Sequence, residues 1–171
     1  MEEYIDDFAR AISPCYDLYV ALHSSKRSYP DIFTDRRCNV ILTAIMGGHN
    51  RGWRVVGITR KALQHYIDSD FAHRSGNGIQ RGHIVPRIQT TASVMATEAP
   101  LLLEELARLW FDVDATVLCA AGENKAILPD DYIRFDNPRC DLFPGKQVGW
   151  QHSKAEKEFL RSLASSNGLC S

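Results

Sequence analysis

The sequence predicts an α+β fold, in which a helical N-terminal region packs on a small core of short strands with added helices. Two observations lead to this prediction. Apolar residues recur at helical spacing through the first third of the chain, and short apolar, β-branched runs follow in the middle. With 171 residues, 44% of them hydrophobic, the chain can bury one core. We therefore expect a single domain over 1–171, with a helical region (1–50), a core (51–135) and a C-terminal loop and helix (136–171).

The elements of the first half follow from periodicity and capping. Apolar stripes at 3–12, 16–22 and 35–48 predict three helices, the last of them closed by two glycines. The run 53–58 predicts a buried strand, and Thr59 is a good N-cap for a helix over 60–67. A second strand is predicted over 79–85, because Pro86 ends it.

The second half continues in the same way. An amphipathic pattern predicts a helix over 99–111, and the run "ATVLCA" at 115–120 predicts a strand. The segment "GENKAIL" at 122–128 predicts a turn that leads into a helical turn. In the tail, Ser153 and Glu156 form a capping-box pattern, which predicts a helix from 153 onward.

Charge is balanced overall and uneven locally. The net charge of −1 gives no general attraction to nucleic acid or to an anionic membrane. Residues 51–90, however, hold seven Arg or Lys against two Asp, whereas residues 91–131 hold eight acids against two bases. Positive charge is therefore concentrated around the second predicted strand.

Cysteine usage and the N-terminus predict the compartment. The five cysteines are scattered with no C-x-x-C pair, which argues against a zinc knuckle or a thioredoxin-like site and fits a reducing compartment. The first ten residues are acidic, and no run of about 18 apolar residues is present. We expect a soluble, cytoplasmic protein without a membrane partner.

Two segments carry residues suited to phosphodiester chemistry: "RGHIVPR" at 81–87 and "TVLCAAGENKAILP" at 116–129. Hydrolysis of a phosphodiester needs a base that deprotonates water and a cation that absorbs negative charge. A neutral imidazole such as that of His83 can be the base near neutral pH. An amide oxygen such as that of Asn124 can hold Mg²⁺, which usually keeps several waters.

The order of these segments resembles the HNH or ββα-metal nuclease superfamily, over about residues 79–130. The resemblance implies a ββα-metal core with His83 as the general base and Asn124 as the ligand of one Mg²⁺ or Mn²⁺. Arg81-Gly82-His83 is similar to the branch with a "DRGH" signature, although Gln80 replaces the aspartate. Gly82 stands where most members have an acid, and no histidine follows Asn124 closely, so Asp130 or Asp131 is the nearest substitute ligand.

The resemblance implies a metal-dependent endonuclease of restriction or mobile-element type. Double-stranded DNA is favoured over RNA as the partner, and a homodimer is the usual arrangement for cutting both strands of a palindrome. The candidate site residues are His83 and Arg81 for catalysis, Asn124 for the metal, and Arg87, Lys125, Arg54 and Lys146 for substrate.

Other interpretations stay open at this level. His83 fits a partly buried strand histidine, Asn124 fits a helix cap, and Arg81 and Arg87 fit solvated surface charge. A non-catalytic nucleic-acid- or protein-binding module on a degenerate scaffold is one alternative. A hydrolase or transferase that acts on a small phosphorylated ligand, with the Arg-rich residues 51–87 as its pocket, is another. The geometry of His83 relative to Asn124 discriminates among them, because a base and a cation ligand must face one cleft.

Overall fold

The protein divides into two compact units, each formed by two separate stretches of the chain. The computed structural model describes residues 2–46, 54–71, 78–124, 131–135, 142–143 and 154–169. The helical unit is formed by Met1–Trp53 and Val85–Ala115, and the sheet unit by Arg54–Ile84 and Thr116–Ser171. The expected α+β class is confirmed. The expected single folding domain stays a prediction.

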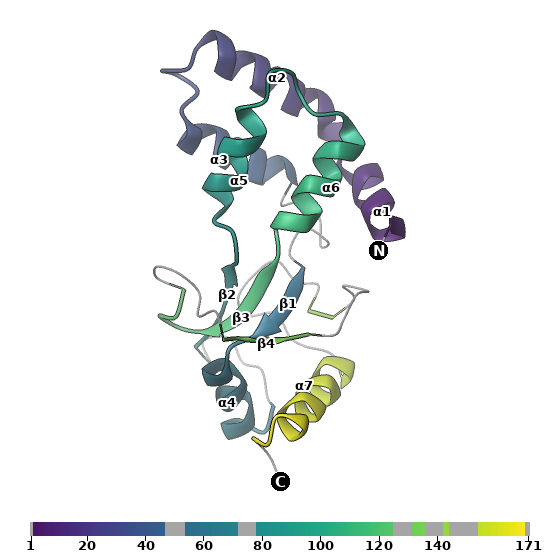
Figure 1. Cartoon of the computed structure of the whole chain (residues 1–171), viewed down its shortest axis with the longest axis vertical. Coiled ribbons are helices and arrows are strands. Elements are labelled where there is room, and N and C mark those ends of the chain that lie inside the picture. Colours follow the sequence, from purple (N-terminus) through teal and green to yellow (C-terminus); the bar gives the residue numbers. More distant parts are fainter. Residues whose placement is uncertain are drawn as a thin grey trace. The chain divides into compact units, whose positions relative to one another are not determined.

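The helical unit consists of helices only in its described residues. In chain order they are α1 (Glu2–Ile12), η1 (Ser13–Cys15), α2 (Tyr16–Ser28), α3 (Asp35–Met46), α5 (Arg87–Met95) and α6 (Leu103–Val113). Helix α1 packs on α6, and α3 packs on α5 (Figure 1). Buried aromatic side chains, among them Phe8 of α1 and Trp110 of α6, form much of its interior. The three N-terminal helices begin within a residue of the predicted apolar stripes, and α2 extends beyond the predicted 16–22 through a polar segment to Ser28.

The structure corrects the sequence-based predictions for several elements, among them α5, β2 and α6. The sequence predicts no element over 87–95, yet α5 forms there. The helix was missed because two of its buried positions, Thr90 and Thr91, are polar and interrupt the apolar pattern. The Thr91 hydroxyl donates to Asn39 Oδ1 at 3.0 Å, which satisfies it inside the unit. The strand expected over 79–85 ends at His83, and the helix expected over 99–111 spans 103–113.

The sheet unit holds a four-stranded mixed sheet in the order β2-β3-β1-β4. The strands are β1 (Val55–Ile58), β2 (Ile79–His83), β3 (Thr116–Ala120) and β4 (Ile133–Arg134), and the helices are α4 (Arg60–Asp68) and α7 (Lys154–Ser166). Strand β3 lies parallel to β1 and antiparallel to β2, and β4 runs antiparallel to β1.

Helices α4 and α7 lie beside each other on one side of the sheet (Figure 1). One apolar cluster joins them to the strands, with Leu63 and Tyr66 from α4, Leu160 from α7, and Ile58 and Leu118 from the sheet. Every residue of β3 is buried, as expected for a central strand. The predicted cap of α4 is confirmed, because Thr59 Oγ1 accepts a hydrogen bond from the Ala62 amide at 3.1 Å.

Candidate functional site

The structure places the two sequence segments on neighbouring strands. The strand that carries Arg81-Gly82-His83 pairs antiparallel with Thr116–Ala120 over its whole length. Apart from Ile84, the residues between the two strands belong to the helical unit (Val85–Ala115) and contain α5 and α6. The long spacing in sequence is therefore taken up by an inserted helical segment, as the pattern at 99–111 requires.

His83 lies at the last position of β2, partly exposed, and pairs with Thr116 at the first position of β3. Arg54 lies at the same edge of the sheet, because its carbonyl oxygen accepts hydrogen bonds from the Thr116 amide at 2.7 Å and the Thr116 hydroxyl at 3.0 Å. Two strand spacings separate β2 from β1, which is about 10 Å. Of the sequence-predicted residues, the structure thus brings Arg54 to the edge that carries His83.

Asn124 lies at the opposite edge of the sheet. Ala120, the last residue of β3, pairs with Ile79, the first residue of β2. Asn124 follows in an exposed turn over 121–124, in which Gly122 has a φ of +95° that favours glycine. His83 pairs with Thr116, four residue steps back along β3, so about 13 Å of strand separates the two ends of the ladder. The described residues do not bring the base and the amide to one place.

Glu123 and Thr59 connect the ends of the two parallel strands. One carboxylate oxygen of Glu123 accepts hydrogen bonds from the Thr59 hydroxyl and from the Ala120 amide, both at 2.6 Å. Because β1 and β3 are parallel, their carboxyl ends meet at this edge. The Thr59 hydroxyl therefore serves both the start of α4 and the turn that presents Asn124. The sequence marked Thr59 only as a cap, since nothing local to it points to a carboxylate 64 positions away.

Arg81, in the middle of β2, is buried, and its side chain bonds to other residues of the sheet unit. Its guanidinium donates to the Phe143 carbonyl at 2.5 Å, and the Phe143 amide donates to Glu156 Oε1 at 2.5 Å. Phe143 has a φ of +58°, which is costly for an aromatic residue, so these two bonds hold it from both sides. Burial lowers the pKa of Arg81 to about 10 against the opposing charge of Glu156, and it stays charged at neutral pH.

Glu156 therefore does more than the expected capping box describes. Its side chain is buried and takes part in the tertiary contact at Phe143. The expected N-cap, Ser153, lies outside the described residues. Sequence reasoning missed the link between Arg81 and Glu156, although a buried-strand arginine and an acid at the start of an amphipathic helix are the kinds of residue that pair across a core.

Arg87 belongs to the helical unit, at the first position of α5. Its Nε and a terminal nitrogen donate to the two carboxylate oxygens of Asp114 at 2.8 and 2.7 Å. Both side chains are largely buried, so this guanidinium is neutralised within its own unit. Lys125 and Lys146, the other expected phosphate contacts, lie outside the described residues.

The side-chain oxygen atoms at Asn124 and its neighbour are of the kind that coordinate a hard cation. The Asn124 amide and the Glu123 carboxylate next to it offer oxygen atoms, which suit Mg²⁺. Among the described residues, no group of three or more His, Cys, Asp or Glu side chains is placed to hold a metal. The residues present therefore fit a cation at the Asn124 edge by donor type, and they do not put His83 beside it.

No protein-family model matches the chain, and neither the curated proteins nor the solved structures contain a match. Within the described part of the chain, no helix combines the length and the apolar character that crossing a membrane requires.

Proposed function

We propose that this chain is a metal-dependent nuclease that hydrolyses phosphodiester bonds, with His83 as the general base. The observation that supports the proposal is strand pairing. The strand ending in Arg-Gly-His and the strand leading into Glu-Asn are antiparallel neighbours, despite the helical segment inserted between them. Two adjacent antiparallel strands that carry these residues are what the resemblance to a ββα-metal core implies.

Partial exposure of His83 at a strand end suits its proposed role. A neutral imidazole there can accept a proton from an attacking water. Arg54, whose backbone lies at the same edge, is the basic residue that the proposal assigns to the phosphate. The proposal includes double-stranded DNA as the substrate, ahead of RNA, a homodimer that cuts both strands, and action in the cytoplasm. Arg81 and Arg87 enter it as residues that hold the fold, because their guanidinium groups are already bound.

Mg²⁺ or Mn²⁺ is the expected cofactor, and a bound cation would neutralise charge on the phosphate and on the leaving oxygen. Asn124 and Glu123 are the described residues that could hold it. Because they lie at the other end of the β2–β3 ladder from His83, no step of the reaction is assigned to the cation.

A second candidate function is a nucleic-acid-binding module without catalysis. The separation of His83 from Asn124 favours it, because a base and a cation held at opposite ends of one strand pair do not act on the same phosphate. Under this alternative the basic residues Arg54, Arg60 and Lys61 of the sheet unit contact phosphates, and no bond is broken.

Incubation of the full chain with supercoiled plasmid and with labelled RNA separates the two functions. The nuclease proposal expects cleavage with Mg²⁺ or Mn²⁺, none with EDTA, and a rate at least about 100-fold lower for His83→Ala. His65→Ala is the matched control, because His65 is an exposed histidine of α4 in the same unit. Equal cleavage by His83→Ala and wild type contradicts the proposal. Salt-dependent binding without cleavage of either substrate supports the binding module.

A further inference from the structure

The helical unit has an apolar groove that lies between α2 and α3. Leu18, Ala21 and Ser25 line it from α2, and Val40, Ile41 and Ala44 line it from α3; these six residues define the α2–α3 groove. Leu18 is 59% exposed and Val40 is 65% exposed, although both are large and apolar. Ala21, Ser25 and Ala44 also line the groove, and their small side chains leave room for side chains of a partner.

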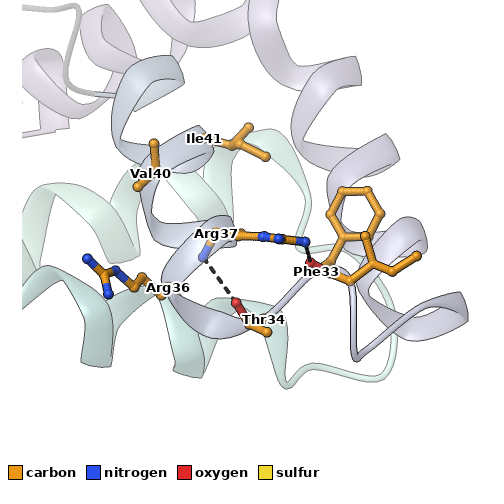
Figure 2. Close-up of a pocket in the computed structure, with 7 residues that line it drawn as sticks. Phe33, Thr34, Arg36, Arg37, Val40 and Ile41 are labelled. Atoms are coloured by element: carbon orange, nitrogen blue, oxygen red, sulfur yellow. Dashed lines mark hydrogen bonds between the residues drawn. The ribbon is translucent and has the colours of Figure 1, made fainter.

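The groove continues to the start of α3, where it becomes positively charged. Val40 and Ile41 also line a second hollow with Phe33, Arg36 and Arg37. Figure 2 shows Arg36 and Arg37 extending from α3 in opposite directions, with Val40 and Ile41 further along the helix. Arg37 donates to the Ile32 carbonyl at 2.8 Å, a neutral acceptor that leaves its charge uncompensated. Of the described residues, those lining the two hollows include these two arginines and no acid.

We propose that the α2–α3 groove binds an amphipathic helix of a partner protein, with apolar side chains in the groove and Asp or Glu side chains at Arg36 and Arg37. A helix that binds in a groove between two helices makes contact through residues at i, i+3, i+4 and i+7, and apolar side chains at these positions are buried against the apolar lining of the groove. Charge complementarity at the rim selects acidic flanks and sets the direction of the bound helix. This inference is independent of the proposed nuclease activity.

The charge pattern also distinguishes this partner from two others. A second copy of the chain docked groove to groove would present the same pair of arginines and no acid, so like charges would approach each other. A nucleic acid would neutralise Arg36 and Arg37 and would leave the exposed apolar side chains of Leu18 and Val40 in contact with water.

Two designed helical peptides of about 20 residues test the proposal, since shorter helices are marginal in water. Both carry the same leucine face, and one is flanked by Glu and the other by Lys. Fluorescence anisotropy with the full chain is expected to show micromolar binding of the Glu peptide and at least about 10-fold weaker binding of the Lys peptide.

Variants in the groove locate the binding. Leu18→Asp is expected to weaken binding of the Glu peptide at least about 10-fold. Leu102→Asp is the matched control, because Leu102 is 62% exposed and lies in the same unit outside the groove. Arg36→Glu is expected to weaken binding of the Glu peptide and to strengthen binding of the Lys peptide.

Three results overturn the proposal. The first is that the Glu peptide does not bind at a concentration of about 100 μM, which is well above the expected micromolar dissociation constant. The second is equal binding of both peptides. The third is a dimer in light scattering that Leu18→Asp dissociates, which would mean that a second copy occupies the groove.

Discussion

The ion pair between Arg87 and Asp114 joins the two ends of the inserted helical segment. Arg87 is the first residue of α5, and Asp114 follows the last residue of α6. Two hydrogen bonds at 2.8 and 2.7 Å connect them, and their side chains are only 10% and 2% exposed. The perturbation we consider is Arg87→Met, which keeps most of the volume and leaves the Asp114 carboxylate buried without its partner.

The size of the effect follows from burial. Removing one partner of a buried ion pair costs about 3–5 kcal/mol of unfolding free energy, because the remaining charge is desolvated and uncompensated. Replacing both partners, in Arg87→Met with Asp114→Leu, is expected to recover much of that loss. Arg108→Met is the matched control, since the pair Arg108–Glu2 has similar geometry and is exposed to solvent. A much smaller effect is expected there.

Urea unfolding followed by circular dichroism measures these free energies. If the two units unfold in separate steps, the transition that shifts with Arg87→Met belongs to the helical unit. A loss below about 1 kcal/mol for Arg87→Met, or a double variant less stable than either single variant, would refute the reasoning from burial.

Three further predictions concern the sheet unit. Arg81→Met is expected to lower the unfolding free energy by about 2 kcal/mol, because the Phe143 carbonyl loses a charged donor, and urea unfolding measures the loss. Burial raises the pKa of the Cys119 thiol from 9.0 to about 11. Because the unfolded chain loses this proton at lower pH than the folded protein, the stability that the protonated thiol contributes is complete below pH 9 and is lost as the pH rises through 11. Mass spectrometry after iodoacetamide treatment is expected to find Cys119 alkylated only in unfolded protein. Thr59→Ala is expected to cost about 1–2 kcal/mol in thermal or urea unfolding while Thr59→Ser costs little, and equal losses would contradict the hydroxyl's role.

Elements with a strong local signal were predictable from the sequence. The apolar stripes of the first third mark α1 to α3, and Thr59 marks the start of α4, because each signal acts over one or two helical turns. Helix α5 carries no such signal. Its buried face includes two threonines whose burial depends on packing against α3, which periodicity alone cannot indicate.

The candidate site was predictable in its parts and not in its arrangement. Strand alternation predicts that Arg81 and His83 share one face of β2. The burial of Arg81, by contrast, depends on Phe143 and Glu156, which come from distant parts of the chain. The separation of His83 from Asn124 depends on the register of β2 against β3. Register is set by which residues of both strands meet the core, so a single strand's sequence does not determine it.

The most direct measurement is the rate at which the full chain nicks supercoiled plasmid in Mg²⁺, for wild type, His83→Ala and His65→Ala. The nuclease proposal predicts that His65→Ala cleaves at the wild-type rate and that His83→Ala is slower by at least about 100-fold, the contribution of a general base. Equal rates for all three proteins would contradict the assignment of His83 and would leave the binding module as the better account of the sheet unit.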